Sequence, residues 1–374
     1  MPISTSHFVT RIHAATGQLV LAVTGGGSGA VSSLLRVPGA SRTILEAMVP
    51  YAAASLAALL GGPPDQACSA PTARAMAMAA YLRACRYGAA GPLAGVGCTA
   101  SLASDRPKRG DHRVHVALQT AASTSLWSLE LAKGRRGRDE DEELASLLVL
   151  NAVAAACGLD ERLELPLVGG EQVELQSITA PGPWRDLLSG QLDKIRHCGA
   201  ANPLASRVIF PGAFNPLHGG HRHMAEIAAE MLAAPVEFEI SILNVDKPPL
   251  DYLEIERRAA QFGAHPLWLT RAATFQAKSA LFPGAAFVVG VDTIRRIANP
   301  KYYGGSDAAC RAAIEQIVAR GCRFLVFGRA QDGQFVGLSQ IELPEPLRSA
   351  SREVPGERFR EDVSSTELRR QWES

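Results

Sequence analysis

The sequence has almost no excess of charge of either sign. Its 374 residues include 38 lysines and arginines against 37 aspartates and glutamates, which gives a formal net charge of +1. Such a chain produces no overall field that would hold it on nucleic acid or on an anionic membrane, so we expect neither as a partner. Any anionic ligand must therefore be bound by a local group of donors.

Long apolar runs and paired cysteines are also missing. The first apolar run, Leu19 to Val23, is short and ends in glycines, and the alanine-rich stretch 52–60 is too short to span a bilayer. The seven cysteines are scattered without a C-x-x-C pair, which is typical of reduced thiols. We predict a soluble cytoplasmic protein that holds no structural metal, and the sequence leaves a homo-oligomer open.

The chain does contain enough apolar residues, 47% of the total, for two hydrophobic cores. Residues 1–160 alternate alanine-rich helical patterns with short strands, of which 114–118 is the clearest. Prolines and glycines interrupt residues 161–204, where only 184–197 looks helical, so we predict a linker with one helix. From 205 to 374 apolar strands alternate with helices. This pattern predicts an α/β domain with a doubly wound parallel sheet, whose ligands bind at the carboxyl ends of the strands.

The first strand of this second domain, residues 208–210, leads into a turn and a helix that carry a recognisable pattern. A glycine at a strand end lets the backbone approach a ligand, and a helix N-terminus favours anions. The residues concerned are Gly212, Ala213, Phe214, His218 and His221. They resemble the signature of the nucleotidylyltransferase superfamily, in its cytidylyltransferase-like group: a strand, a G-x-F-x-P turn and an H-x-G-H sequence.

Two later segments resemble the same superfamily in the order that it requires. Gly290 and Asp292 follow an apolar strand, where the resemblance implies the nucleotide pocket. Near the C-terminus, residues 363–369 resemble I-S-S-T-x-I-R, a helix start that binds the triphosphate. The residues implied there are Ser364, Ser365, Thr366 and Arg369. Three ordered matches make chance an unsatisfactory explanation, although Ser364 and Glu367 also form a capping box that is compatible with this role.

The resemblance implies transfer of a nucleoside monophosphate from a triphosphate, which carries Mg²⁺, to a phosphate-bearing acceptor. That reaction needs no protein nucleophile, so catalysis consists of positioning and charge stabilisation. His218 and His221 would contact the transferring phosphate, and Arg369 the departing pyrophosphate. Lys247 and Arg257 are weaker candidates for substrate contacts.

Other interpretations of the second half stay open. His218, His221 and His223 could form a zinc site with His197 or Cys198, although no second ligand pair has metal spacing. The transfer could be adenylyl transfer to nicotinamide or nicotinate mononucleotide, or cytidylyl transfer to another acceptor. A nucleotide-binding regulatory or scaffold protein without turnover is the alternative from a different class.

A glycine-rich segment, Thr24 to Ala30, follows the first apolar run. It contains G-x-G-x-x-A, and Glu46 stands at a distance along the chain that is typical of a ribose contact in a dinucleotide fold. That fold requires a strand ending at the acid, whereas residues 42–48 look helical. An isolated glycine pattern is a weak signal.

The wider pattern of the first half, including 37–41 and 49–51, resembles the C-terminal domain of the competence-damage protein family. The resemblance covers roughly the first 155 residues and implies an α/β amidase-like domain, whose active members deamidate nicotinamide mononucleotide. Those members carry a serine nucleophile, a tyrosine, and a lysine five residues beyond it. Thr24 and Tyr51 match the first two, but Leu56 stands at the lysine. Because leucine cannot activate a hydroxyl nucleophile, we expect a non-catalytic domain that keeps a nucleotide-binding loop, and residual amidase activity is the alternative.

Overall fold

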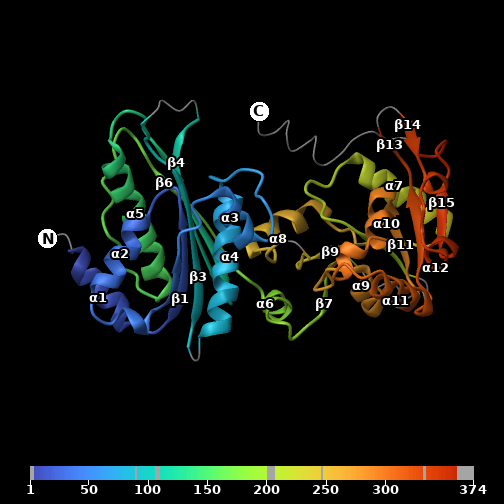
Figure 1. Cartoon of the computed structure of the whole chain (residues 1–374), viewed down its shortest axis with the longest axis horizontal. Helices are drawn as coiled ribbons and strands as arrows, with labels where there is room; N and C mark the ends of the chain where they lie inside the picture. The colour runs from blue at the N-terminus through green and yellow to red at the C-terminus, as the bar shows by residue number, and fades with distance from the viewer. Residues whose placement is uncertain are drawn as a thin grey trace. The chain divides into compact units, whose positions relative to one another are not determined.

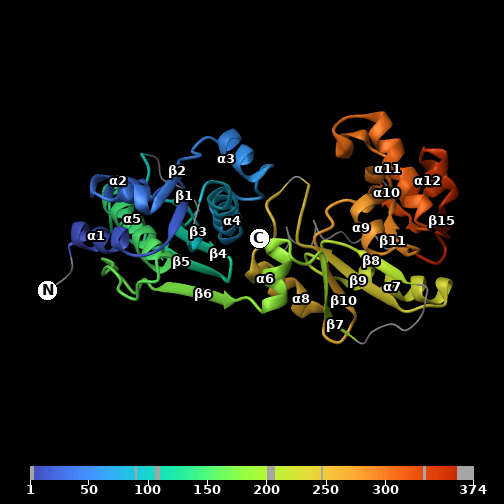
Figure 2. The same ribbon diagram turned by 90° about the horizontal axis from the view of Figure 1, so that it is seen from below.

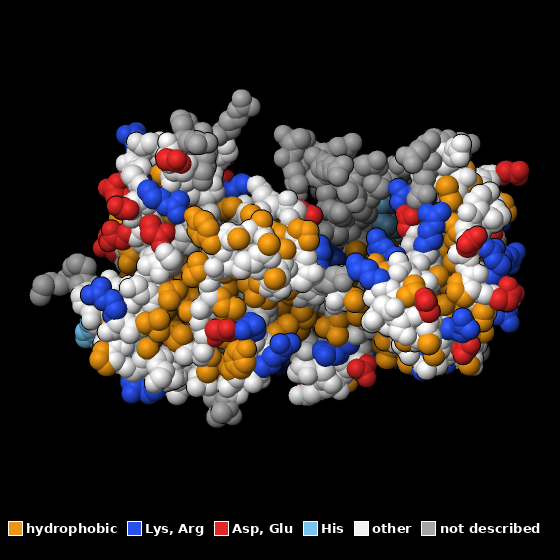
Figure 3. Space-filling model, in the orientation of Figure 1, with side chains coloured by type: hydrophobic (Ala, Val, Ile, Leu, Met, Phe, Trp, Pro, Cys, Tyr) orange, Lys and Arg blue, Asp and Glu red, His pale blue; other side chains and the backbone are white. Residues whose placement is uncertain are grey.

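A computed structural model describes residues 4–88, 91–105, 110–199, 207–245, 247–331 and 334–359. The chain divides into two compact units: Met1–Arg185 with Asp246–Glu254, and Asp186–Val245 with Ile255–Ser374. Within the described ranges, no helix combines the length and the apolar character needed to cross a membrane. Figure 3 shows basic and acidic side chains interspersed on the visible face of the second unit, so no field of a single sign covers that face.

The first unit is built on a mixed six-stranded sheet in the order β2-β1-β3-β4-β5-β6. Its strands are β1 (Gln18–Thr24), β2 (Ile44–Met48), β3 (Leu93–Ser101), β4 (His112–Thr120), β5 (Ser123–Leu131) and β6 (Val173–Thr179). Strand β1, next to the edge strand β2, pairs in parallel with β2 and β3, and the other neighbouring pairs are antiparallel. Six of the seven residues of β1 are buried, as expected for a strand covered on both faces.

Helices cover both faces of this sheet (Figure 1). One face carries α1 (Thr5–Ala14), α2 (Ser28–Arg36) and α5 (Arg138–Ala156), and the other carries α3 (Ala53–Leu60) and α4 (Ala70–Tyr87). The main core lies on the first of these faces, with Leu21, Val96 and Val149 among its buried members. On the second face α4 lies directly on β3: a Cβ on Gly97 would stand 2.4 Å from the carbonyl oxygen of Ala73, so only glycine fits there.

The second unit is built on a seven-stranded sheet in the order β15-β12-β11-β8-β9-β10-β7. Its strands are β7 (Lys194–Cys198), β8 (Val208–Pro211), β9 (Val236–Ser241), β10 (Leu267–Thr270), β11 (Ala286–Gly290), β12 (Arg323–Phe327) and β15 (Ser351–Val354). All pairs are parallel except the edge pair of β7 and β10. A hairpin of β13 (Arg329–Gln331) and β14 (Gln334–Val336) follows β12.

Figure 2 shows α7 (Gly219–Leu232) on one face of this sheet and α9 (Phe275–Leu281), α11 (Asp307–Ala319) and α12 (Glu345–Ser349) on the other. The second face also carries α10 (Val291–Ile297), and buried Phe287 and Phe324 lie in its core. Two further helices, α6 (Gly182–Ser189) and α8 (Tyr252–Ala259), contain two of the three points where the chain passes from one unit to the other.

The order of the strands locates the ligand site of the second unit. From β8 the chain passes to β9 and β10 on one side, and then returns to β11 on the other side of β8. The connections that follow β8 and β11 therefore lead away in opposite directions along the sheet. Ligands of doubly wound sheets bind at the carboxyl ends of the strands where the order reverses in this way. The predicted α/β fold class, with a doubly wound second sheet, is confirmed.

Two segments differ from the sequence prediction. Residues 161–204, expected to be a linker with one helix, contain β6, α6 and β7. Most of the prolines and glycines lie between these elements, and Gly182 and Pro183 lie in the first turn of α6, where a proline is tolerated. The pairing of β7 with β10 is also not visible locally, since its partner lies about 70 residues later in the chain. The stretch 42–48, expected to be helical, forms β2 after a single 3₁₀ turn, because β1 provides a parallel partner.

Candidate functional site

The turn after β8 is held by aromatic packing. Gly212 donates its N–H to the carbonyl oxygen of Glu239 at 3.0 Å, and the chain then turns at Phe214, whose φ is +44°. The Phe214 ring is 1% exposed and makes edge contacts with Phe238 and Phe262. A Cβ on Gly212 would lie 2.6 Å from this ring, which explains the glycine. Phe214 therefore supports the turn with its ring, so a nucleotide can approach only its backbone.

The two histidines lie together at the start of α7. Their rings stack with centroids 3.7 Å apart, and the His218 N–H donates to Nδ1 of His221 at 3.3 Å. Because Nδ1 accepts this hydrogen bond, the neutral His221 ring carries its proton on Nε2. The Phe214 ring contacts His221 edge-on at 5.1 Å and fixes the plane of the imidazole. The arrangement presents an N–H donor beside a helix N-terminus, which suits a phosphate oxygen.

Burial, together with the nearby His218, lowers the pKa of His221 from 6.5 to about 3. The ring is therefore neutral near pH 7, and its contribution to phosphate binding is a hydrogen bond rather than a full charge.

This lowered pKa predicts acid sensitivity. Below pH 6.5 the unfolded chain binds a proton at His221 that the folded chain does not take up until about pH 3, so stability falls as the pH drops through this window. At pH 5 the loss is about 2 kcal/mol. Urea titrations at pH 7 and pH 5 should show a smaller pH-dependent loss in His221→Gln than in the wild type. His223→Gln, on the same helix, serves as the control, and equal losses in both variants would contradict the prediction.

The predicted nucleotide residues at β11 lie at the neighbouring strand end. Gly290 ends β11 and Asp292 lies in the first turn of α10. The carboxylate of Asp292 pairs with Arg329 at 2.5 Å and lies 4.0 Å from Arg295. The sequence did not single out Arg329. The sequence feature that could have indicated Arg329 is its position just after β12, the strand next to β11 in the sheet.

The weaker substrate candidates are placed differently. The exposed Arg257 donates to the side-chain oxygen of Asn215 in the turn, whereas Lys247 is exposed and belongs to the segment included in the first unit. Ser364, Ser365, Thr366 and Arg369 lie outside the described residues. The zinc interpretation gains no support, because the described part of the chain contains no group of three or more His, Cys, Asp or Glu side chains that could hold a metal.

The first unit contains a cavity of about 220 Å³ at the carboxyl end of β1. Thr24 and Tyr51 both line it, so the structure brings these two predicted residues together. Thr24, however, donates its hydroxyl to the carbonyl oxygen of Pro50 at 3.0 Å. Leu56 is 3% exposed and packs with Leu60 and Met76, in a core cluster away from the cavity lining.

Glu142 of α5 occupies the donors of the glycine-rich loop. Its carboxylate accepts the N–H of Gly27 at 2.9 Å, the N–H of Gly29 at 3.1 Å and the Ser28 hydroxyl at 2.9 Å. These are the donors that an anion would use at the start of α2. The expectation that this loop binds a nucleotide phosphate is therefore not supported, since the protein supplies its own anion. No local sequence signal connects Glu142 with a loop more than 110 residues earlier.

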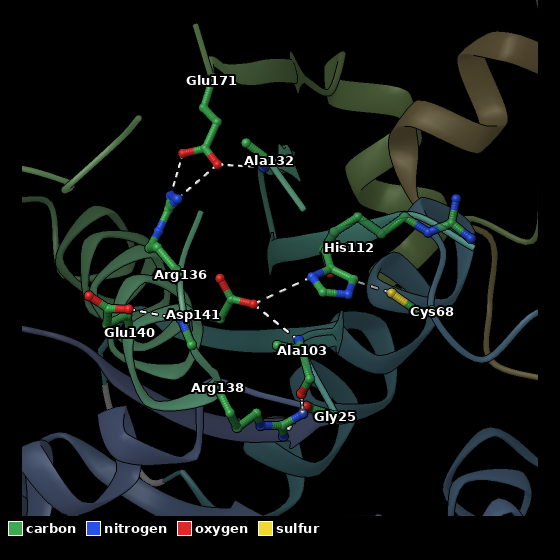
Figure 4. Close-up of polar contacts among 12 residues, drawn as sticks. Gly25, Cys68, Ala103, His112, Ala132, Arg136, Arg138, Glu140, Asp141 and Glu171 are labelled. Carbon is green, nitrogen blue, oxygen red and sulfur yellow. Dashed lines mark hydrogen bonds and ion pairs between the residues drawn. The ribbon is translucent and has the colours of Figure 1, made fainter. Parts of the chain in front are cut away.

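The start of α5 is fixed by a wider polar network (Figure 4). Arg138 donates to the carbonyl oxygens of Gly25 at 2.9 Å and Ala103 at 3.2 Å. Asp141 accepts the N–H of Ala103 at 3.1 Å and lies 3.6 Å from His112. The first turn of α5 therefore holds both the glycine-rich loop and the segment after β3, which keeps Glu142 in place.

Glu46 lies on a strand, contrary to the sequence prediction, but does not act as a ribose ligand would. It stands in the middle of β2, and its carboxylate is held by two hydrogen bonds from Arg83 at 2.6 and 2.5 Å. A dinucleotide fold needs this acid at the strand end and a free glycine loop. Neither condition is met.

Replacing Glu142 with alanine should destabilise the first unit by about 1 to 3 kcal/mol, because three donors lose their acceptor. Thermal and urea unfolding would measure the loss, with the exposed neighbour Glu143→Ala as the matched control. Inorganic phosphate should restore part of the stability of the Glu142 variant and leave the control unchanged. Equal stability of the two variants would show that Glu142 is not the acceptor of this loop.

The solved structures that are similar to this chain include two competence-damage proteins. One is competence/damage inducible protein CihA from Agrobacterium tumefaciens, with 20% identity, a TM-score of 0.33, and coverage of 43% of this chain and 98% of that one. The other is a competence-damaged protein (CinA) superfamily protein from Escherichia coli, with 16% identity, a TM-score of 0.29, and coverage of 40% and 87%. Comparison with curated proteins gives no match.

The second half matches a known family directly. Residues 209–371 match the cytidylyltransferase-like family, over a range that includes the turn, both histidines and the C-terminal segment singled out from the sequence. The resemblance inferred for this half is thus confirmed: residues 209–371 are similar to the cytidylyltransferase-like family.

Proposed function

We propose that the second unit transfers a nucleoside monophosphate from a triphosphate to a phosphate-bearing acceptor. The observation that carries this proposal is the stacked pair of His218 and His221 at the start of α7, where the strand order reverses. An oxygen of the acceptor phosphate attacks the α-phosphorus while the bond from that phosphorus to the β-phosphate oxygen breaks, and pyrophosphate leaves. No protein nucleophile is needed.

The roles follow from the geometry of the helix start. His221 donates from Nε2 to an oxygen on the transferring phosphorus, and the backbone N–H groups of the first turn of α7 add partial positive charge. Mg²⁺ enters with the triphosphate, as part of the substrate. Ser364, Ser365, Thr366 and Arg369 are proposed to bind the triphosphate chain on the strength of the sequence resemblance.

We propose ATP as the donor, and nicotinamide or nicotinate mononucleotide as the acceptor. The support is the sequence resemblance of the first half to a family whose active members handle nicotinamide mononucleotide. The first unit itself is proposed to be non-catalytic, since Thr24 is bonded to a backbone carbonyl and Leu56 is buried. Cytidylyl transfer is the alternative chemistry within the same fold.

The full-length protein should be incubated with Mg²⁺, each of the four common nucleoside triphosphates and each candidate acceptor, while pyrophosphate and ammonia are measured together. We expect acceptor-dependent pyrophosphate with ATP and a pyridine mononucleotide, and no ammonia. Pyrophosphate only with CTP would identify a cytidylyltransferase. Nucleotide binding without pyrophosphate from any pair would favour a regulatory or scaffold protein.

A further inference from the structure

The turn that leads to the two histidines is tied at both ends by a single side chain. Gln261 lies in a 3₁₀ turn that directly follows α8, within the second unit. Its Nε2 donates to the carbonyl oxygen of Phe214 at 3.1 Å, and its Oε1 accepts the N–H of Leu217 at 2.8 Å. Leu217 immediately precedes His218, so this amide bridges the turn just before the first histidine.

Only a primary amide satisfies both ends of this turn. One partner is an acceptor and the other is a donor, so the amide fits in one orientation, with its nitrogen toward Phe214 and its oxygen toward Leu217. A carboxylate in the same place would keep the contact with Leu217 but would set an oxygen against the Phe214 carbonyl. An apolar side chain of equal length would lose both bonds.

Neighbouring contacts place the amide firmly. Gln261 also donates to the carbonyl oxygen of Arg258 at 3.2 Å, and Arg258 in turn donates to the carbonyl oxygen of Ala213 at 3.0 Å. Next to Gln261, the Phe262 ring contacts the Phe214 ring edge-on at 5.3 Å. The end of α8 and the 3₁₀ turn thus hold the residue before the turn 214–217, the buried ring of Phe214 and the last residue of the turn.

We infer that Gln261 is a positioning residue for nucleotidyl transfer, which fixes the turn 214–217 so that His218 and His221 face the transferring phosphate. This inference rests on the proposed function. Gln261 acts through the backbone and through the Phe214 ring, which contacts His221 at 5.1 Å. Charge stabilisation by a donor depends on sub-ångström placement, so a looser turn should slow the chemical step more than it weakens substrate binding.

The test compares Gln261→Met and Gln261→Glu with Gln276→Met. Gln276 is a half-buried glutamine whose side-chain amide donates to the side chain of Gln316 at 2.9 Å, far in the chain from the histidine turn, so it serves as the matched control. We expect kcat to fall about 10- to 100-fold in both Gln261 variants, with each KM within about threefold of wild type. Melting temperatures should show that the variants are folded, and the glutamate variant keeps one of the two bonds.

A second readout does not depend on turnover. In NMR titrations the His221 ring should protonate at a higher pH in Gln261→Met than in wild type, as water enters the loosened turn. Unchanged kcat and an unchanged His221 titration in both variants would overturn the inference, as would a rise in KM alone, which would indicate direct substrate contact. A shifted titration in a protein without transferase activity would reject the proposed function while supporting the positioning of His221.

Discussion

Replacing His221 with alanine is expected to lower the rate of nucleotidyl transfer by about 10²-fold or more, the scale found when one preorganised donor is removed. The His221 ring offers its N–H from Nε2, because its Nδ1 accepts the backbone N–H of His218. Initial rates of pyrophosphate release over a range of triphosphate concentrations would measure the effect. The loss should fall mainly on kcat, because the donor acts on charge that develops in the transition state.

His223→Ala is the matched control for this experiment. It lies half a turn further along α7, where its ring contacts Phe359 rather than the histidine pair. We expect its rate to stay within about threefold of wild type. Full activity in the His221 variant would show that this residue does not take part in the reaction. The family match would then not predict the catalytic residues of this chain.

Replacing Lys278 with methionine is expected to cost the second unit about 3 to 5 kcal/mol of stability. Its Nζ lies 2.6 and 2.8 Å from the two carboxylate oxygens of Glu239, which is fully buried. Without the lysine, the carboxylate keeps only the hydroxyl of Thr270 as a side-chain donor among the contacts of the described residues. Differential scanning calorimetry should show the transition of the second unit lowered by roughly 10 °C.

A double variant tests the cause of this loss. Lys278→Met together with Glu239→Gln removes the uncompensated charge and should recover a large part of the stability. The exposed Lys301→Met should change the melting temperature very little. A loss below about 1 kcal/mol in the single variant would show that the pair is not important for stability.

The sequence predicted the second sheet well because continuous apolar strands and helical spacing are local signals. The candidate site residues Gly212, His218 and His221 could also be proposed from the sequence, since a single short segment contains all of them. The role of Gln261 could not be predicted from the sequence, because this residue lies 44 positions after Leu217 and only the fold brings the two together.

In the first half, local patterns were less informative. Residues 42–48 look helical in the sequence but pair with β1, because the backbone hydrogen bonds to a parallel neighbour outweigh a weak local propensity. Position 56 is leucine where the resemblance implies a lysine, and the structure adds that this leucine lies in a core cluster. The occupation of the glycine loop by Glu142 joins segments that are far apart in the chain, so a sequence pattern suggested a binding loop where the structure shows an internal partner.

The inclusion of residues 246–254 in the first unit has an evolutionary consequence. Arg74 of α4 is buried and bonds Asp251 at 3.0 Å and Glu254 at 3.1 Å, and both acids are encoded in the second half of the gene. A recombination event that exchanged the transferase half for another would leave this arginine without either acid. The two halves therefore cannot be inherited as freely interchangeable modules, and α4 and the segment 246–254 are expected to change together as lineages diverge.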